Sequence, residues 1–275
     1  MNSFYDNMTN RTRMVIGDET LDMLSRVSVI IFGVGGVGSW CAEGLVRSGL
    51  TNLTMVDSDI VCPSNINRQA QALARNVGES KVEEMKKRLL EINPQASITA
   101  LHAAYDETSF QTFDLSSYDY VIDAIDSLRD KVLLLERCAS SRVTVYSSMG
   151  AGSKTDPAKI RVALLSATTN CPLARSVRRR LRQRNVPADI MCVYSEEQPA
   201  GQTYEAGPDS GPLPTSGGND GSPVCNEDAP SGLNDTKKRI NGSLVHVTGI
   251  FGFMLTGLII NDIRARVGAG DQGHR

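Results

Sequence analysis

A glycine-rich turn is the segment of this sequence with the clearest chemistry. The apolar run Val29–Phe32 is followed by glycines at the spacing G-x-G-x-x-G, namely Gly33, Gly35, Gly36 and Gly38. Such glycines allow a tight turn, bring backbone N–H groups close to phosphate and aim a helix N-terminus at negative charge. Asp57, after the next apolar run, could hold ribose hydroxyls. The pattern predicts a nucleotide site; the alternative is that the glycines only allow close strand–helix packing.

The residues after Asp57 indicate which nucleotide binds. Polar and charged side chains follow at Asp59, Ser64, Asn65, Asn67, Arg68 and Lys81. A helix N-terminus already neutralises the pyrophosphate of a dinucleotide, whereas a triphosphate needs further cations. Asp59 and Asp126 are candidate ligands of Mg²⁺, which takes carboxylates together with substrate phosphates. We therefore predict ATP and Mg²⁺ as cofactors. Each residue taken alone could instead be a solvated charge or a turn residue.

Alternating strand and helix patterns must position these residues. Strands are predicted at Val27–Phe32, Leu53–Val56, Ser97–Leu101, Asp119–Ile122, Val143–Ser147, Ile160–Leu164 and Ile190–Tyr194. Helices are predicted at Gly38–Gly49, Ser80–Asn93, Leu128–Ser140 and Leu173–Gln183. Alternation of this kind gives parallel strands. The predicted fold is α/β, a Rossmann-like, doubly wound and mostly parallel sheet with a C-terminal extension.

Composition bounds the class of protein. The 275 residues carry a net charge of -2, which argues against a chain that is basic all over. The six cysteines form no C-x-x-C pair, so neither a four-cysteine zinc site nor a disulfide framework is indicated. The N-terminus has no secretory or transit pattern, which favours a cytoplasmic protein. Gln198–Asn234 is rich in Gly, Pro and Ser and is expected to be disordered, and Gly268–Arg275 is expected to fray.

Together these motifs resemble the adenylating family of ubiquitin-activating-like enzymes, which includes activators of molybdopterin and thiamine sulfur carriers. The turn, Asp57-Ser-Asp59, Ser64-Asn-Ile-Asn-Arg68, Lys81 and Asp123-Ala-Ile-Asp126-Ser127 carry the resemblance. It implies that residues 10–195 form an ATP-binding adenylating domain, followed by the loop 196–238 and a helical segment 239–267. It also implies that ATP and metal are bound by Gly35, Asp57, Asn65, Arg68, Lys81 and Asp126. Within a homodimer, Arg13 would reach the phosphates of the neighbouring subunit.

Three further stretches are similar to one branch of that family, the tRNA threonylcarbamoyladenosine dehydratases. They are Ser147–Ile160, the stretch beginning at Pro172, and Cys192–Pro199. The resemblance implies ATP-dependent cyclisation of a carboxylate-bearing base in tRNA, with Arg68, Lys81, Asp126 and Arg13 as catalytic residues. One departure is Cys171, where the branch leads us to expect Asp before Pro-Leu. Cys192 could trap an acyl group, but a buried, small hydrophobic residue is the favoured interpretation.

A run of arginines predicts the contact with tRNA. Its members are Arg175, Arg178, Arg179, Arg180 and Arg182. Arginines bind backbone phosphates without reading base sequence, and Lys154 and Lys159 could extend the patch. The alternative is a solvated helix face paired with acidic residues.

An uncharged segment at residues 240–261 approaches the length of a membrane span. We favour a helix buried against the sheet or in a dimer interface, with His246 as a hydrogen-bonded core residue. The alternative is membrane association, and the resemblance to eukaryotic dehydratases makes the mitochondrial outer membrane the matching location.

Rival functions remain open at this point. The nearest is a sulfur-carrier or ubiquitin-like protein adenylyltransferase. An NAD-linked oxidoreductase and a non-catalytic tRNA-binding protein belong to other classes. A sulfur-relay or redox protein also stays open as a partner.

Overall fold

The computed structural model describes residues 3–198 and 242–271. Its strands are β1 (Ser28–Phe32), β2 (Asn52–Val56), β3 (Ser97–Leu101), β4 (Tyr120–Asp123), β5 (Thr144–Ser148), β6 (Ile160–Leu164) and β7 (Met191–Ser195). Its α-helices are α1 (Ser3–Ile16), α2 (Asp18–Arg26), α3 (Gly38–Ser48), α4 (Lys81–Ile92), α5 (Leu128–Ser141), α6 (Pro172–Gln183) and α7 (Val245–Asp271). Every predicted strand and helix is present, and α1 and α2 are additional. The low-complexity loop, apart from Gln198, lies outside the described residues.

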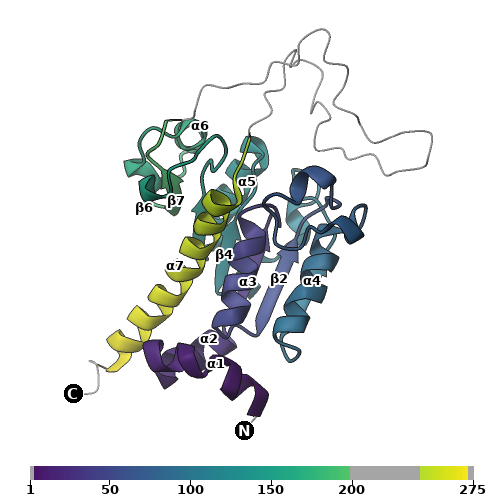
Figure 1. Cartoon of the computed structure of the whole chain (residues 1–275). Coiled ribbons are helices and arrows are strands. Elements are labelled where there is room, and N and C mark those ends of the chain that lie inside the picture. The colour runs from purple at the N-terminus through teal and green to yellow at the C-terminus, as the bar shows by residue number, and fades with distance from the viewer. Residues whose placement is uncertain (1–2, 199–241, 272–275) are drawn as a thin grey trace.

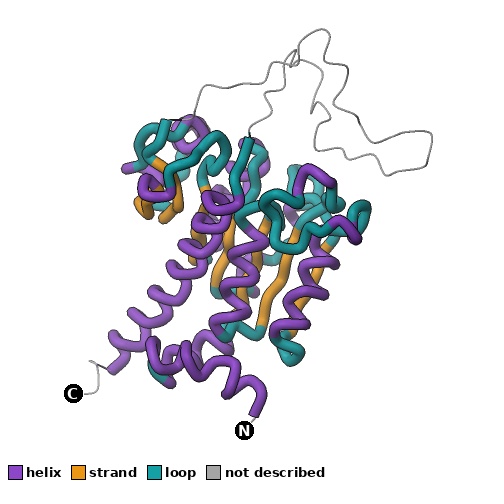
Figure 2. Tube along the Cα trace, in the orientation of Figure 1, coloured by secondary structure: helices purple, strands orange, loops and turns teal. Residues whose placement is uncertain are grey.

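The strands form one sheet in the order β3-β2-β1-β4-β5-β7-β6 (Figure 2). Every neighbouring pair is parallel except β6 and β7, which are antiparallel. Residues Val29–Phe32 of β1 and all of β4 are buried, because helices cover the sheet. The predicted α/β fold with a mostly parallel sheet is confirmed.

The order of the strands reverses at β1, and this reversal creates the site. The chain runs from β1 outward to β2 and β3, and then returns to place β4 on the other side of β1. In open α/β sheets a ligand binds at such a switch point, beyond the carboxyl ends of the strands. Phe32 is paired with Val56 on one side and with Asp123 on the other. The segments that follow these three residues therefore leave the sheet side by side.

Helix α7 packs along α3 rather than standing apart (Figure 1). Its buried face repeats every fourth residue, at Val247, Phe251, Leu255, Ile259 and Ile263. A Cβ on Gly44 of α3 would lie 2.6 Å from Thr256 Oγ1, so this glycine lets the helices approach closely. By length and composition α7 could cross a membrane, but half of its apolar window is buried in the protein. The preferred interpretation, a helix packed within the fold, accounts for its apolar character.

Two expectations for the C-terminal segment were wrong in detail. Helix α7 includes residues 268–271, which were expected to fray, while residues 272–275 lie outside the described residues. Asp262 accepts a hydrogen bond from Tyr120 at 2.7 Å and pairs with Arg266 at 2.8 Å, which anchors the last turns to the sheet. His246 is hydrogen-bonded, with Nε2 3.0 Å from the Thr155 carbonyl oxygen, but it is exposed and not part of the core.

Glu43, a buried carboxylate on α3, gives the fold a testable pH dependence. Burial alone would raise its pKa, but hydrogen bonds from Arg88 and Arg47 outweigh burial and lower it. A lowered folded-state pKa stabilises the fold above the ordinary glutamate pKa, and this stabilisation is lost as pH falls through the lowered value. Glu43→Gln should therefore lower the free energy of unfolding at pH 7 by about 1–3 kcal/mol. Denaturant unfolding across pH should show this difference shrinking in acid; a pH-independent difference would contradict the assignment.

Candidate functional site

The glycine turn after β1 has the geometry of a phosphate-binding turn. Gly33 has a φ of 89°, and its N–H donates to the Val56 carbonyl oxygen at 2.9 Å. A Cβ on Gly38 would lie only 1.9 Å from the Gly33 carbonyl oxygen, so no side chain fits there. At Gly35 an added Cβ would have no protein atom nearer than 3.9 Å, and the turn is open on that side. The N-terminus of α3 thus faces the turn, and its positive end favours an anion there.

Asp57 joins the end of β2 to this turn. Its carboxylate accepts the N–H of Val34 at 2.6 Å and the N–H of Asp59 at 2.9 Å. Burial raises the pKa of the Asp57 carboxyl, while the charge of Lys81 acts in the opposite direction. The carboxylate is held against the turn at the position that the motif predicts, and its binding to ribose hydroxyls stays a prediction.

Lys81 and Asp59 form an ion pair beside Asp57. Lys81 is the first residue of α4, only 2% exposed, and its Nζ lies 2.9 Å from Asp59 Oδ2. Asp59, predicted as a metal ligand, is therefore the counter-ion of this lysine in the structure. Asn65 is fully buried and its Oδ1 accepts the N–H of Cys62 at 3.1 Å, which holds the loop after β2. Direct contacts of these side chains with ATP stay predictions.

Arg68 lies over the glycine turn. A Cβ on Gly36 would sit 3.2 Å from the Cγ and Cδ atoms of this arginine. Its Nη1 donates to the Ser64 carbonyl oxygen at 2.8 Å and to Asn67 Oδ1 at 3.1 Å. Asn67 in turn donates to the Ser243 carbonyl oxygen at 3.0 Å. The predicted residues of this loop come together above the turn, and they connect it to the segment that begins α7.

Asp126 follows β4 on the other side of the turn. It is exposed and forms no ion pair with any described residue. Ser127 is the N-cap residue of α5, and its predicted contact with the nucleotide stays a prediction. No group of three or more His, Cys, Asp or Glu side chains gathers among the described residues. One free carboxylate beside a phosphate turn still suits Mg²⁺, because substrate phosphates and water complete its coordination.

A buried cluster that the sequence motifs did not indicate lies under this loop. Asp123 Oδ2 lies 2.7 Å from Lys131 Nζ and 2.5 Å from Ser147 Oγ, and Lys131 also donates to the Ser148 carbonyl oxygen at 2.9 Å. Asp123 and Lys131 are both fully buried. An aspartate at a strand end and a lysine eight residues later would ordinarily be read as solvated, so only the fold brings them together.

Arg13 lies far from the turn of its own chain. It pairs with Asp6 at 3.0 Å and with Asp18 at 2.7 Å. Its helix α1 contacts the far end of α3, where the Tyr5 hydroxyl donates to the Gly49 carbonyl oxygen at 2.7 Å. Helix α3 spans about 16 Å, so a role for Arg13 needs a second subunit, as the family resemblance implies.

The cysteines divide into structural roles. Cys171 Sγ accepts the N–H of Ala174 at 3.5 Å and so caps α6, which is what an Asp at this position would do. Cys192 is fully buried, and burial raises the pKa of its thiol to about 12. This supports a small core residue rather than a nucleophile. Cys41 and Cys138 are buried and free, like Cys171 and Cys192.

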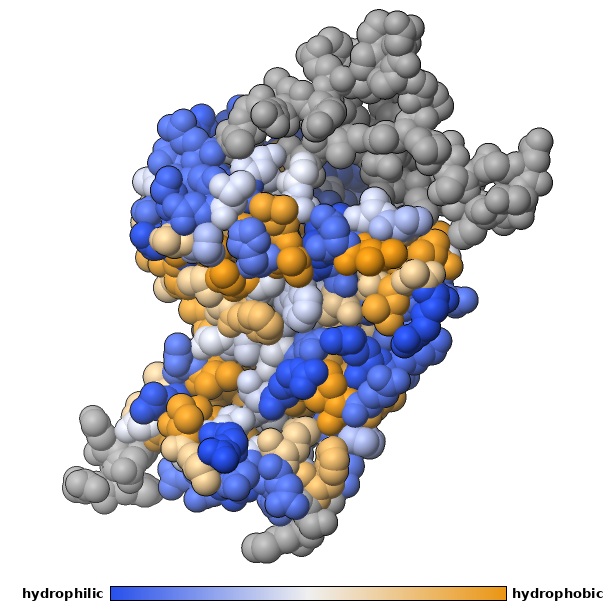
Figure 3. All heavy atoms as spheres, viewed as in Figure 1, coloured by the Kyte–Doolittle hydropathy of each residue, from blue (hydrophilic) through white to orange (hydrophobic). Residues whose placement is uncertain are grey.

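The arginine helix α6 is only partly free to bind a partner. Arg178 Nη1 donates to the carbonyl oxygens of Leu165 at 3.0 Å and Thr168 at 2.9 Å, so this arginine braces its neighbourhood. Arg175, Arg179 and Arg182 are exposed, and Figure 3 shows hydrophilic residues gathered over this region.

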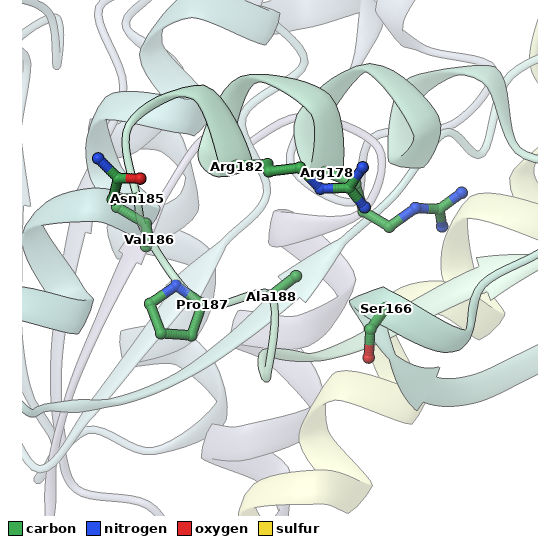
Figure 4. Close-up of a pocket in the computed structure, with 7 residues that line it drawn as sticks. All are labelled: Ser166, Arg178, Arg182, Asn185, Val186, Pro187 and Ala188. Atoms are coloured by element: carbon green, nitrogen blue, oxygen red, sulfur yellow. The ribbon is translucent and has the colours of Figure 1, made fainter.

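A groove of about 430 Å³ lies beside the C-terminal half of α6. Arg178 and Arg182 line it together with residues 185–188 and Ser166 (Figure 4). Lys154 does not extend the surface patch as predicted: it is 3% exposed, and burial lowers the pKa of its ammonium group.

Comparison with known proteins identifies the family. A model of the ThiF family matches residues 9–265. This chain belongs to the ThiF family. A Bacillus subtilis tRNA threonylcarbamoyladenosine dehydratase is 40% identical over 190 residues, covering 69% of this chain and 75% of that protein. An Escherichia coli protein of the same name is 36% identical over 193 residues, covering 68% and 72%. The Saccharomyces cerevisiae tRNA threonylcarbamoyladenosine dehydratase 2 is 35% identical over 250 residues. The match covers 90% of this chain and 54% of the yeast protein.

Solved structures agree with these relatives. The E. coli tRNA N6-threonylcarbamoyladenosine dehydratase in complex with AMP matches this ThiF-family chain with a TM-score of 0.80 and 28% identity over 98% of both chains. The same enzyme in complex with ATP gives a TM-score of 0.78. The resemblance to this branch of the adenylating family is confirmed.

Two glycines of the turn separate folding from nucleotide binding. Gly38→Ala should prevent the turn from closing, because its Cβ would overlap the Gly33 carbonyl oxygen, and thermal melting should show marked destabilisation. Gly35→Ala has room in the protein and should keep the wild-type melting temperature, yet it should weaken ATP binding in calorimetry because its methyl group stands where phosphate approaches. Equal melting temperatures for the two variants would contradict the geometry.

Proposed function

We propose that this chain is an ATP-dependent dehydratase that adenylates the carboxylate of threonylcarbamoyladenosine in tRNA and cyclises the modified base. The supporting observation is the arrangement of Arg68, Lys81 and Asp57 around an open phosphate turn. The names of the B. subtilis and E. coli relatives support the choice of substrate. The ATP and AMP complexes of the E. coli enzyme favour an adenylating reaction over an NAD-linked oxidoreductase.

In the first step a carboxylate oxygen of the base attacks the α-phosphorus of ATP, and pyrophosphate leaves. An acyl-adenylate forms. Arg68 and Lys81 stabilise the negative charge that develops on the phosphates. Asp126 would hold Mg²⁺, which would supply positive charge to the phosphates. Asp59 pairs with Lys81 and keeps its ammonium group in place.

In the second step a nucleophile within the same modified base attacks the acyl carbon, the ring closes and AMP leaves. The two groups belong to one nucleoside, so the step is effectively intramolecular and needs no enzyme nucleophile. The active form is a homodimer in which Arg13 of each subunit approaches the phosphates of the other. The protein acts in the cytoplasm, and the packing of α7 favours this location over the mitochondrial outer membrane.

Arg68→Ala and Lys81→Ala test the reaction. Each removes a cation directed at the transition state and should reduce the rate of cyclisation about a hundredfold. Mass spectrometry of nucleosides from tRNA incubated with protein and ATP measures the product. Lys87→Ala is the matched control, because Lys87 lies on α4 but is exposed and paired with Glu84. Wild-type activity in both site variants, with normal folding, would refute the assignment.

Cys192→Ser separates this reaction from that of activators that use a catalytic cysteine. The buried thiol has no role in the two steps above, so the variant should keep most of its activity. No thioester should appear by mass spectrometry of the intact wild-type protein during turnover. A covalent acyl adduct on any cysteine, formed as fast as product, would overturn the direct mechanism.

The exposed arginines of α6 should bind the tRNA backbone. Replacing Arg175, Arg179 and Arg182 together with Gln should weaken tRNA binding and reduce its salt dependence by close to one unit of slope for each lost phosphate contact. Titrations of tRNA across a salt series measure this, with ATP affinity as an unaffected reference. Arg178→Gln is the internal comparison and should mainly lower the melting temperature. An unchanged slope in the triple variant would assign the helix to another role.

A further inference from the structure

The buried cluster under the loop after β4 joins three separate elements. Asp123 ends β4, Ser147 belongs to β5 and Lys131 lies on α5. The ammonium of Lys131 and the hydroxyl of Ser147 both donate to Asp123 Oδ2. The other carboxylate oxygen, Oδ1, accepts the backbone N–H of Ile125 at 3.2 Å. One buried carboxylate therefore fixes both the strand end and the loop that carries Asp126.

The same loop is held from its other side by the phosphate turn. The N–H of Ala124 donates to the Phe32 carbonyl oxygen at 2.9 Å. A Cβ on Gly33 would lie 2.7 Å from the Ala124 carbonyl oxygen, so the two backbones are in close contact. The backbone before Asp126 is thus held between the turn and the buried cluster. The Asp126 carboxylate itself remains exposed and makes no ion pair with any described residue.

Stability alone does not account for a fully buried ion pair. Removing two charges from water is unfavourable, and well-packed apolar side chains of similar volume often stabilise a core equally well or better. Hydrogen-bonded partners behind a metal ligand, by contrast, orient that ligand and strongly affect metal affinity. Asp123 lies three residues before the free carboxylate of Asp126 at the phosphate turn. This position suits a residue that orients a metal ligand better than one that only stabilises the core.

We propose that Asp123 and Lys131 form a positioning pair, which holds the loop 124–127 so that the Asp126 carboxylate meets the metal that accompanies the nucleotide. Neither residue of the pair contacts substrate. The role of Asp126 in this proposal rests on the proposed function. The two positioning residues are not assigned a role by the motif alone.

Lys131→Met tests the pair, because it removes the charge and both hydrogen bonds while keeping an unbranched side chain. Lys131→Arg keeps the charge and should recover most of the effect. The control is Arg88→Met, which removes another ion pair with a buried carboxylate: Arg88 Nε lies 2.6 Å from Glu43 Oε2, on α4 and α3. Ser147→Ala removes only one hydrogen bond to Asp123, and it keeps the test decisive if Lys131→Met does not fold.

Two measurements decide the outcome. Hydrogen exchange without nucleotide should show lost protection of the Ile125 amide in Lys131→Met, and a smaller loss in Ser147→Ala. The Mg²⁺ concentration for half-maximal ATP binding, measured by calorimetry, should rise about tenfold or more in Lys131→Met. Lys131→Arg should lie near the wild type. Arg88→Met should change only the melting temperature.

The proposal is overturned if Lys131→Met, or Ser147→Ala in its place, lowers the melting temperature but leaves the exchange of the loop and the Mg²⁺ requirement unchanged. It is also overturned if Arg88→Met raises the Mg²⁺ requirement equally. Wild-type ATP binding that is independent of Mg²⁺ would reject the role of Asp126 in the proposed function. The exchange data would still show whether the pair holds the loop, so the two failures are distinguishable.

Discussion

The contact between Gly38 and the Gly33 carbonyl oxygen is the constraint on which the site depends. A Cβ at residue 38 would lie 1.9 Å from that oxygen, so the chain can pass from β1 to α3 this tightly only with glycine there. The tight passage leaves the N-terminus of α3 facing the open side of the turn. It also brings Asp57 from β2 and the loop after β4 into contact with the turn. One close backbone approach therefore brings together the positive end of α3, the carboxylate of Asp57 and the loop that carries Asp126.

The remainder of the fold keeps α3 in that position. Glycines on α3 and α7 allow the two helices to pack closely: a Cβ on Gly252 would lie 2.6 Å from the Val37 carbonyl oxygen, just before α3 begins. Trp40 of α3 donates to the Arg68 carbonyl oxygen at 2.8 Å, which ties the cationic loop to the same helix. The apolar helix α7 thus helps to hold α3 and the glycine turn in place. Its apolar residues are explained by this packing.

Most of the sheet, the glycine turn and the positions of the charged residues beside it could be predicted from the sequence, because apolar runs and glycine spacing report local geometry directly. The phosphate turn, Asp57 and Arg68 are of this kind. Long-range pairing could not be predicted. The sequence around Asp59 does not indicate that Lys81 is its ion-pair partner. The sequence around Lys131 does not indicate that this lysine pairs with a buried aspartate. The run of arginines likewise does not indicate that Arg178 differs from its neighbours. Its guanidinium donates to the backbone carbonyl oxygens of Leu165 and Thr168. Helices α1 and α2 lack the long apolar period that marked the others.

In the proposed reaction the carboxylate of the modified base attacks the α-phosphorus of ATP in the site built on this turn. Isotope transfer tests it most directly. Substrate tRNA carrying ¹⁸O in that carboxylate is incubated with the protein, ATP and Mg²⁺, and the nucleotide products are analysed by mass spectrometry. We expect one ¹⁸O atom in AMP for each ring closed, and none in pyrophosphate. Label in inorganic phosphate, or unlabelled AMP beside cyclised product, would contradict it.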